Sequence, residues 1–437
     1  MTARQAALAI LERCRRDGAW LSAAADGVIR KNGLSKRDAA LGSAIVLGVL
    51  QNTSYFDFLI GSFCSTRPEK LERKVLDILR IGVCQLLLLD RIPARAAVNE
   101  TVALCETAGV GRARALVNAV LRRIAESRGA LPEVPDEGKP SFLATRYSQP
   151  PWLAEKLVEE KGYDFTEACF AAFNRPSLLD IQINTLRTSM EEYVRALDRL
   201  DIPYEIPPFP ADCLRIAGGA VSELPGYDEG LFYVQDRAAR TAVGIVGLQS
   251  GMRVLDACAS PGGKSFAAAL AMRGEGEIVA CDIHEKKLPL IRSGAERLGF
   301  SLISAECRDA REFVPEWESA FDAVLADVPC SGFGVVGKKP EIRFKDPGEI
   351  AALPAIQRSI LDNLCRYVRP GGTLLYSTCT ILREENEDVI ASFLAEHDAF
   401  TPCEFSIDGR GSRGGGYTFY PNIDGTDGFF VAKLQRK

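Results

Sequence analysis

The sequence predicts three parts: an all-helical N-terminal domain, a small α+β domain and a C-terminal α/β domain with a largely parallel sheet. Apolar residues recur at helical spacing through residues 1–130. Residues 145–240 combine helix and strand patterns. From about residue 240 onward, strands and helices alternate, which is typical of a parallel sheet covered on both faces. The 437 residues are enough for two or three domains with sizeable cores.

The composition excludes several classes of protein. Charged residues make up 25% and apolar residues 47%, as in an ordinary globular chain, and no apolar run approaches the roughly 18 residues that span a bilayer. Thirteen cysteines without a C-x-x-C pair argue against a disulfide framework and a zinc site. His284 and His397 are the only histidines, so histidine catalysis is unexpected. We expect no metal, no membrane association and a cytoplasmic location.

Charge is distributed unevenly along the chain. Residues 1–130 hold 20 Lys and Arg against 12 Asp and Glu, a net charge of +8, whereas the remainder holds 33 against 46, a net charge of −13. Such asymmetry suggests that the N-terminal domain meets a polyanion. A solvated arginine face is the alternative, and charge alone does not decide between them.

The helical pattern of residues 1–130 has recognisable boundaries. Helices are expected around Ala7–Cys14, after Ser35, around Val75–Val83, at Ala97–Leu104 and at Ala113–Arg128. Ser35 is a candidate N-cap with Asp38 in the following turn, and Ile92-Pro93 interrupts the chain. Arg122 and Arg123 lie beside the apolar stripe of the last helix, where they either flank the core or face phosphates.

A linker is expected at residues 131–144, because Pro, Gly and charged residues occur there without periodicity. The small α+β domain follows at 145–240. Its expected elements are a helix at Trp152–Lys161, a strand at Leu179–Asn184 and a helix at Glu191–Leu200.

The C-terminal domain, 241–437, begins with a strand, a loop of small residues and a helix through Phe266–Met272. The loop is Ala257-Cys258-Ala259-Ser260-Pro261-Gly262-Gly263-Lys264. Small residues let backbone amides approach a ligand at the start of a helix. Asp282 and Asp309 follow the next two strand patterns, where an acid can accept hydrogen bonds from ribose. Together with Asp256 at the end of the first strand, this series favours a nucleoside-bearing cofactor over three unrelated turn residues.

Two other cofactor classes fit the loop less well. Gly263-Lys264-Ser265 ends like a phosphate-binding loop, but the position that needs the first glycine is Cys258. A dinucleotide dehydrogenase would carry G-x-G-x-x-G after the first strand, and this motif is absent.

Two further strand patterns end in cysteines. Phe321–Ala326 leads into Asp327 and Cys330, and the apolar run from Gly372, entered through Pro370-Gly371, leads into Cys379. In an open α/β sheet, ligands bind outside the carboxyl ends of the strands. An acid and two thiols are therefore expected at the rim of the site. The alternative is that each cysteine only packs as a small apolar residue.

These motifs resemble those of the RNA (cytosine-5)-methyltransferases that use S-adenosylmethionine. The principal matches are Asp256-Ala257-Cys258-Ala259-Ser260-Pro261-Gly262-Gly263-Lys264, Asp327-Val328-Pro329-Cys330-Ser331-Gly332 and Ser377-Thr378-Cys379-Thr380. Supporting matches are Gln235-Asp236-Arg237, Lys339-Pro340-Glu341-Ile342-Arg343, Glu384-Glu385-Asn386 and Asp427-Gly428-Phe429-Phe430. Residues 1–130 resemble the NusB-type RNA-binding domain, and the pairing resembles the bacterial enzymes that act on 16S rRNA. Gln149 and Gln182 depart from the pattern, where His and Arg are common.

The resemblance implies a Rossmann-like class I methyltransferase core of about seven strands, the last pair antiparallel. It implies that S-adenosylmethionine is bound by the loop residues Ala257, Cys258, Ala259, Ser260, Pro261, Gly262, Gly263 and Lys264 and by the acids Asp282, Asp309 and Asp327. It also implies 16S rRNA as partner, with no DNA expected, and a chain that acts as a monomer.

The chemistry of the reaction explains why two thiols are needed. Cytosine C5 becomes a nucleophile only when a thiolate adds to C6, and the thiolate must later leave. The resemblance implies that Cys379 is this nucleophile, that Cys330 assists release and that Asp327 contacts the base edge. Cys330 as nucleophile, as in the DNA enzymes of this chemistry, is the rival assignment. Lys264, Lys338 or Lys339 is expected to assist thiol ionisation.

Substrate contacts and two alternative functions complete the expectations. Lys338, Lys339, Arg343 and Phe344 are candidates to hold the substrate strand, from which the target base must be exposed; a solvated loop is the alternative. The same chemistry on tRNA is one alternative function. A non-catalytic RNA-binding assembly factor is the other, and the two cysteines with the complete cofactor loop argue against it.

Overall fold

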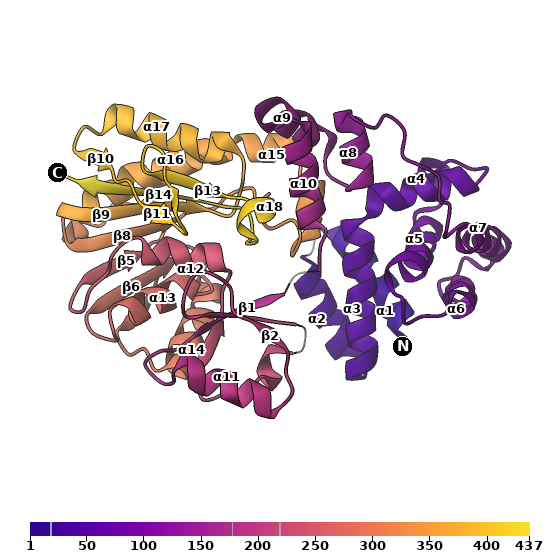
Figure 1. Cartoon of the computed structure of the whole chain (residues 1–437), viewed down its shortest axis with the longest axis horizontal. Coiled ribbons are helices and arrows are strands. Elements are labelled where there is room, and N and C mark those ends of the chain that lie inside the picture. The colour runs from indigo at the N-terminus through magenta and orange to yellow at the C-terminus, as the bar shows by residue number, and fades with distance from the viewer. Residues whose placement is uncertain (18–19, 177, 218–219) are drawn as a thin grey trace. The chain divides into compact units, whose positions relative to one another are not determined.

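The computed structural model (Figure 1) describes residues 1–17, 20–176, 178–217 and 220–437. The chain forms two compact units. The helical unit comprises Met1–Arg175 with Val336–Lys345, and the sheet unit comprises Pro176–Val335 with Asp346–Lys437. The helical unit is therefore discontinuous in sequence, because ten of its residues come from the far part of the chain.

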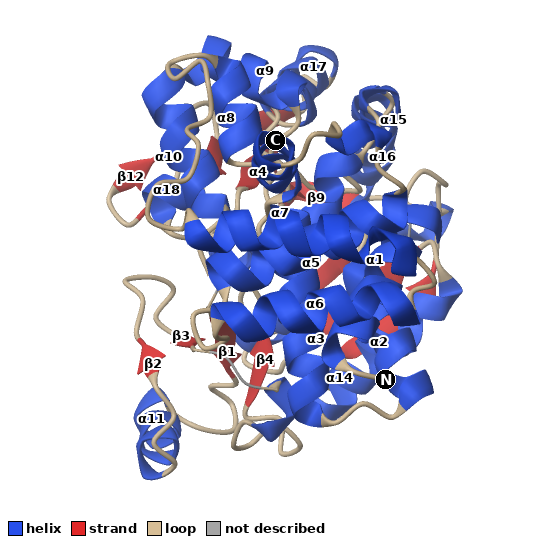
Figure 2. Cartoon of the chain, turned by 90° about the vertical axis from the view of Figure 1, so that its right-hand side faces the viewer, coloured by secondary structure: helices blue, strands red, loops and turns tan. Residues whose placement is uncertain are grey.

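In the described residues up to Glu126, seven α-helices form the N-terminal part of the helical unit, which is shown in Figure 2. They are α1 (Ala3–Asp17), α2 (Leu21–Asn32), α3 (Lys36–Gln51), α4 (Thr53–Phe63), α5 (Arg73–Leu88), α6 (Ala94–Thr107) and α7 (Arg114–Glu126). Ser35 caps α3 as predicted, since its Oγ accepts a hydrogen bond from Asp38 N at 3.1 Å. The expected all-helical character of this region is confirmed.

Helix α5 is the centre of this bundle and contacts α1, α3, α4, α6 and α7. Two of its close contacts depend on glycine. A Cβ atom at Gly82 would lie 2.5 Å from Leu121 Cδ1, and one at Gly48 of α3 would lie 2.7 Å from Cys84 Sγ. Of the described residues, no single helix is long and apolar enough to cross a membrane, and α3 with α4 passes that test only as a pair bent by 81°.

Three further helices belong to the helical unit: α8 (Pro140–Arg146), α9 (Pro151–Lys161) and α10 (Tyr163–Phe173). The expected helix at 152–161 is confirmed by α9. Residues 127–139, between α7 and α8, contain neither helix nor strand, but the expected linker at 131–144 is too long, because α8 already begins at Pro140. Helix α9 begins at Pro151. The first residue of a helix has no partner within the helix for its N–H group, so the missing N–H of proline costs no hydrogen bond there.

The first sheet of the sheet unit has four antiparallel strands in the order β2-β3-β1-β4. These are β1 (Leu179–Ile183), β2 (Tyr204–Glu205), β3 (Cys213–Ile216) and β4 (Phe232–Val234). Helix α11 (Met190–Arg199) starts with a capping box between Ser189 and Glu192 and buries Tyr193 and Leu197 against the sheet. The expected strand and second helix of the α+β domain are both confirmed.

The second sheet is larger and mainly parallel. Its strand order is β10-β14-β9-β8-β5-β6-β7, with β13 paired to β14. The strands are β5 (Arg253–Asp256), β6 (Glu277–Asp282), β7 (Ile303–Cys307), β8 (Phe321–Asp327), β9 (Val368–Thr378), β10 (Phe400–Pro402), β13 (Gly416–Phe419) and β14 (Phe429–Arg436). Strands β5 to β9 are parallel, whereas β10, β13 and β14 run antiparallel to their neighbours.

Helices cover both faces of this sheet (Figure 1). One face carries α12 (Arg237–Gly244), α13 (Gly263–Ala271) and α14 (Leu288–Leu298), and the other carries α16 (Leu353–Leu364) and α17 (Glu387–Glu396). Successive strand residues point to opposite faces, so Val254 packs in the core beneath α13 while Leu255 packs in the core beneath α16. The predicted α/β class is confirmed. Short elements complete the unit: α15 (Pro347–Ala351), α18 (Pro421–Asp424), β11 (Ser406–Ile407) and β12 (Arg410–Gly411).

Two details differ from expectation. The sheet has eight strands rather than about seven, because β13 adds to β14. Strand β9 starts at Val368 and runs through Pro370-Gly371, for which the sequence predicts a turn before the strand. The pairing of β8 with β9 is irregular between Phe321 and Ala323, and this bulge accommodates Pro370 and Gly371 within β9. Gly371 adopts a φ of +76° there.

Candidate active site

The site lies at the carboxyl ends of β5, β8 and β9. Asp327 of β8 is paired with Ser377 of β9 in parallel register, so the loops that follow these two strands emerge side by side. The Sγ atoms of Cys330 and Cys379 lie 3.1 Å apart. This distance fits a hydrogen bond between two free thiols, and a disulfide would need about 2.05 Å. The two cysteines expected at strand ends are thus brought together.

The hydrogen bond between the two thiols, together with burial, raises the pKa of Cys330 well above its ordinary value. Either thiol can be the donor of this bond, and a protonated Cys330 can donate its S–H to the sulfur of Cys379. A donor aimed at a sulfur atom stabilises negative charge there, which is what a nucleophilic thiolate requires.

An ion pair links the cofactor loop to the Pro-Cys loop. Lys264 Nζ lies 2.7 Å from Asp327 Oδ2, and Asp327 Oδ1 accepts a hydrogen bond from Ser377 Oγ at 2.8 Å. The Lys264 ammonium also lies 5.1 Å from the centre of the Phe429 ring, on strand β14. Lys264 is buried and Asp327 is half-buried, so solvent weakens this pair less than a surface pair.

Buried polar residues fix the two cysteine loops. Glu385 Oε2 accepts hydrogen bonds from Ser331 N at 2.8 Å and from Gln357 Nε2 at 2.9 Å. Gln357 Nε2 also donates to Pro329 O at 3.0 Å. Burial raises the pKa of Glu385. These contacts hold the backbone on both sides of Cys330.

Asn386 fixes the backbone of the loop that carries Cys379. Its Nδ2 donates to Thr380 O at 3.0 Å, and its Oδ1 accepts from Thr378 Oγ1 at 2.6 Å. Cys379 is thereby held between two tethered neighbours. In sequence, Glu384-Glu385-Asn386 is only a family match, and in the folded chain Glu385 and Asn386 position both thiols. Gln357 was missed, because one Gln in an amphipathic helix gives no signal of burial.

Close backbone contact brings the loops together at Gly334, which was also missed. Gly334 N donates to Cys379 O at 2.9 Å, and Gly428 N donates to Gly334 O at 2.8 Å. A Cβ atom at Gly334 would lie 1.8 Å from Gly428 O and 2.8 Å from Cys379 O. Only glycine allows this approach, and one glycine among several in this loop does not reveal it in sequence.

The small-residue loop after β5 has the features needed to hold S-adenosylmethionine. Ala257 N donates to Leu325 O at 3.0 Å and Ala259 N donates to Cys281 O at 2.7 Å, so the loop is tied to strands on either side. Gly262 has φ +113°, and a Cβ there would lie 2.5 Å from the Phe266 ring. Burial raises the pKa of Cys258. Ser260 and Pro261 complete the turn, and α13 begins at Gly263.

Asp256 lies beneath this loop and is fully buried. Its Oδ2 accepts a hydrogen bond from Ser265 Oγ at 2.7 Å. Burial raises the pKa of Asp256 to about 6. Asp256 therefore supports the start of α13 from below the loop.

The acids predicted for the cofactor stand at the ends of adjacent strands. Asp282 Oδ1 accepts from His284 N at 2.8 Å, while Lys287 Nζ is 3.5 Å from Oδ2. Asp309 follows β7, and hydrogen bonds from Arg311 lower its pKa. Two carboxylates at this rim are suitable acceptors for ribose and adenine N–H or O–H groups.

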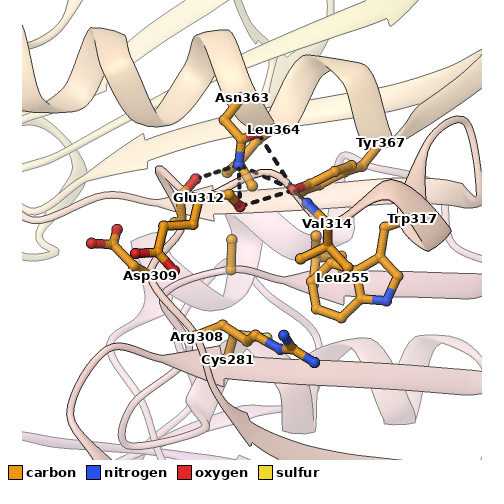
Figure 3. A pocket seen from close by; sticks show the side chains of 12 residues that line it. Leu255, Cys281, Arg308, Asp309, Glu312, Val314, Trp317, Asn363, Leu364 and Tyr367 are labelled. Atoms are coloured by element: carbon orange, nitrogen blue, oxygen red, sulfur yellow. Dashed lines mark hydrogen bonds between the residues drawn. The ribbon is translucent and has the colours of Figure 1, made fainter.

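A small pocket lies beside Asp309 (Figure 3). It is lined by Leu255, Ala257, Cys281, Arg308, Asp309, Ala310, Glu312, Val314, Trp317, Asn363, Leu364 and Tyr367. Asn363 and Tyr367 point at the backbone after Asp309. Asn363 Nδ2 donates to Ala310 O at 2.8 Å, and Tyr367 OH accepts from Val314 N at 2.7 Å. The cavity itself measures only about 10 Å³, so the small-residue loop and the acids, rather than this pocket, are the features that suit the cofactor.

Several expected contacts have other roles. Arg343 is among the candidates to hold the substrate strand, and this prediction is wrong, because only 5% of Arg343 is exposed and its guanidinium binds oxygens within the helical unit. Gln149 and Gln182 are buried as well. Gln182 Nε2 donates to Gln235 O at 2.8 Å, which makes it part of the small sheet's interior.

Family models match nearly the whole chain. Residues 1–126 match the NusB family, 149–222 match the ferredoxin-like domain of the RsmF/B-like methyltransferases, and 244–435 match the 16S rRNA methyltransferase RsmB/F. The "Probable ribosomal RNA small subunit methyltransferase B" of Bacillus subtilis is 33% identical, with 99% of this chain and 98% of that protein covered. The protein of the same description from Synechocystis is 34% identical over the full length of both chains.

A solved structure shows the same architecture. The crystal structure of PH0851 covers 99% of both chains with a TM-score of 0.81 and 26% identity. Fold and site together define a Rossmann-like, S-adenosylmethionine-dependent methyltransferase with a NusB-type domain. Within that class, the chain belongs to the ribosomal RNA small subunit methyltransferase B family. The predicted family, fold class and cofactor are confirmed.

Proposed function

We propose that this protein transfers a methyl group from S-adenosylmethionine to C5 of a cytosine in 16S rRNA, through a covalent bond between Cys379 and C6. The observation that carries the proposal is the 3.1 Å separation of the Cys330 and Cys379 sulfur atoms beside the Lys264–Asp327 pair. A single nucleophilic cysteine would explain attack. A second thiol in contact with it also supplies a proton for release.

The first step activates the base. S-adenosylmethionine supplies an electrophilic methyl group on a sulfonium. The thiolate of Cys379 adds to C6, and negative charge moves onto the pyrimidine ring, which makes C5 nucleophilic. Asp327 contacts the base edge, and the ammonium of Lys264, 2.7 Å from its carboxylate, lies where it stabilises that charge electrostatically. C5 would then form the new carbon–carbon bond as the bond between the methyl group and the sulfonium sulfur breaks, which leaves a neutral thioether.

The second step releases the product. C5 now carries both a proton and the methyl group. The C5–H electrons re-form the C5–C6 double bond as the C6–S bond breaks. The departing Cys379 sulfur takes the proton held by Cys330, and the proton from C5 restores the Cys330 thiol. Cys379 must afterwards lose a proton to solvent before the next turnover.

Cysteine variants test this assignment. Wild type, Cys379→Ala and Cys330→Ala are incubated with unmodified 16S rRNA fragments and labelled S-adenosylmethionine, and methylation and RNA adducts are read on denaturing gels. Cys379→Ala should neither methylate nor crosslink, whereas Cys330→Ala should accumulate an adduct. Cys307→Ala, an exposed cysteine of β7, is the matched control and should behave as wild type.

The other outcomes decide between the alternatives. An adduct that requires Cys330 but not Cys379 would reverse the two roles. Methylation of tRNA in preference to the 16S fragments would change the substrate. No labelling of any RNA would leave a non-catalytic RNA-binding assembly factor as the better account.

We further propose the finer properties of this enzyme. It acts as a monomer in the cytoplasm, on RNA rather than DNA and away from membranes. The helical domain at residues 1–130 contributes RNA affinity. A linker at 131–144 and the small α+β domain at 145–240 come next in the chain, and the domain at 241–437 carries out the methyl transfer. The excess positive charge of residues 1–130 supports this division.

A further inference from the structure

An exposed indole stands at the start of α2 in the helical unit. Trp20 is 46% exposed, whereas Trp317 lies in the core of the sheet unit and Trp152 is half-buried. Two ammonium groups face the Trp20 ring, with Lys339 Nζ 5.5 Å and Lys345 Nζ 5.7 Å from its centre. Phe344, which precedes Lys345, is 57% exposed. The start of α2 therefore presents one exposed aromatic ring. The segment that contains Lys339, Phe344 and Lys345 presents a second exposed ring and two cations.

The segment Val336–Lys345 is firmly held in the helical unit. Glu341 Oε1 accepts a hydrogen bond from Leu21 N at 2.9 Å, directly beside Trp20. Gln51 Nε2 donates to Gly337 O at 2.7 Å. The lysines and the indole are thus fixed relative to one another by contacts on both sides. This is a built surface rather than a chance meeting of flexible side chains.

Arg343 is the main anchor of this segment. Its guanidinium donates to Gln51 O at the end of α3 and to Asn174 Oδ1 after α10, the latter at 2.5 Å. It also donates to Tyr147 O and Ser148 O after α8, each at 3.4 Å. The carboxyl ends of helices carry partial negative charge, so one cation stabilises the ends of α3 and α8 while it also binds the side chain that follows α10. Arg343 is hence a positioning residue that presents Lys339, Phe344 and Lys345 at the surface.

We propose that Trp20, Lys339, Phe344 and Lys345 form a platform on which an unpaired nucleotide of the RNA substrate stacks. The inference rests on the proposed function and identifies where the strand beside the target cytosine is held. Aromatic rings stack on bases, and cations pair with the adjoining phosphates; this combination is typical of surfaces that bind single-stranded nucleic acid. Both lysines carry charge that suits a polyanion.

Continuity with the active site favours RNA over other occupants. Lys339 follows Cys330 by nine residues, so chain connectivity alone keeps it within about 30 Å of that thiol. Between them, Gly334 is bonded to the backbone of Cys379. A nucleic acid that places a base at the cysteines has its neighbouring nucleotides within reach of the segment that follows. An acidic peptide would use the lysines but not the exposed rings.

Tryptophan fluorescence tests the platform directly. A single-stranded oligouridine 12-mer is titrated into wild type, Trp20→Phe and Trp20→Ala. Stacking should quench wild-type emission, and this quenching should disappear in Trp20→Phe, which retains affinity within about threefold because a planar ring remains. Trp20→Ala should weaken binding on the order of tenfold. Leu290→Ala, which removes a side chain 54% exposed on α14, is the control and should change neither value.

A salt titration and a kinetic measurement complete the test. Lys339→Gln should reduce the dependence of log affinity on log salt by about 0.7, and Lys286→Gln, an exposed lysine of the sheet unit, should not. With 16S rRNA, Trp20→Ala should raise KM and leave kcat unchanged. Wild-type quenching retained in Trp20→Phe, or equal affinity of Trp20→Ala, would overturn the platform even if methylation is observed. Quenching by polyglutamate instead of oligouridine would assign the surface to a protein.

Discussion

The ammonium of Lys264 lies 2.7 Å from the carboxylate of Asp327, so one ion pair joins the loop that receives the cofactor to the loop that carries Cys330. The pair couples two parts of the site that are 63 positions apart in sequence. It also keeps a positive charge next to the acid assigned to the base edge. In the proposed mechanism, Lys264 therefore serves substrate chemistry as well as cofactor binding.

Removing the Lys264 charge should therefore affect catalysis beyond cofactor affinity. We expect Lys264→Met to lower kcat by roughly 10²- to 10³-fold, the range found when one group that stabilises developing charge is lost. Single-turnover methylation at saturating S-adenosylmethionine measures this. Lys286→Met, which removes an exposed lysine, should leave kcat unchanged. A defect that saturating cofactor fully restores would limit Lys264 to cofactor binding.

The buried acid Asp256 should make stability depend on pH. Its pKa is raised by burial from 3.8 to about 6, so between about pH 4 and 6 the folded protein holds a proton that the unfolded chain has lost. The free energy of unfolding should thus fall by about 3 kcal/mol as pH rises through this range. Asp256→Asn, which stays neutral, should gain stability relative to wild type from pH 4 to 7.

Urea denaturation at several pH values measures that difference. Asp398→Asn, at an exposed position, is the control and should keep the wild-type profile. A difference between Asp256→Asn and wild type that is constant with pH would contradict the buried, proton-binding role of Asp256.

Gly334 should tolerate no side chain. A Cβ there would lie 1.8 Å from Gly428 O and 2.8 Å from Cys379 O, and neither backbone atom can move without shifting a cysteine loop. We expect Gly334→Ala to reduce methylation at least about 100-fold while S-adenosylmethionine binding, measured by calorimetry, stays near the wild-type value. Gly411→Ala has open space around the new methyl group and should be fully active. Normal turnover by Gly334→Ala would show that the thiols need no such close approach.

Arg343 should be irreplaceable even by lysine. Its two terminal nitrogens donate to four oxygen atoms of the helical unit, and an ammonium has only three donors and no planar fork. We expect Arg343→Lys to lower the free energy of unfolding by about 2–3 kcal/mol and to accelerate proteolysis within 336–345. Arg413→Lys, at an exposed position, is the matched control. Unchanged proteolysis would mean that Glu341 and Gln51 suffice to hold the segment.

Much of this site is predictable from local sequence. Strand ends are marked by a change from apolar to polar residues, and this change alone puts Asp327, Cys330 and Cys379 at the rim of the sheet. Their contact depends on β8 and β9 being neighbours, which the family resemblance implies and local pattern does not. Gln357 and Gly334 could not be predicted, because burial and close backbone approach are properties of the folded chain.

The error at Arg343 has the same origin. An arginine next to two lysines in a polar loop looks like part of a basic surface, and only the folded helical unit provides three helix ends that bury it. Trp20 was missed for the opposite reason. A lone aromatic near a helix start predicts core packing, and its lysine neighbours lie more than 300 positions away in sequence.

The discontinuity of the helical unit affects how the protein is made. An N-terminal domain generally folds while the rest of the chain is still being synthesised. Here the last ten residues of the unit, Val336–Lys345, emerge only after the small sheet and most of the parallel strands. At about 5–20 residues per second, the helix ends that await Arg343 stay uncapped for roughly 10 to 30 s after residue 175 is added. Throughout that interval the nascent helical unit remains open at one end, where chaperones can bind.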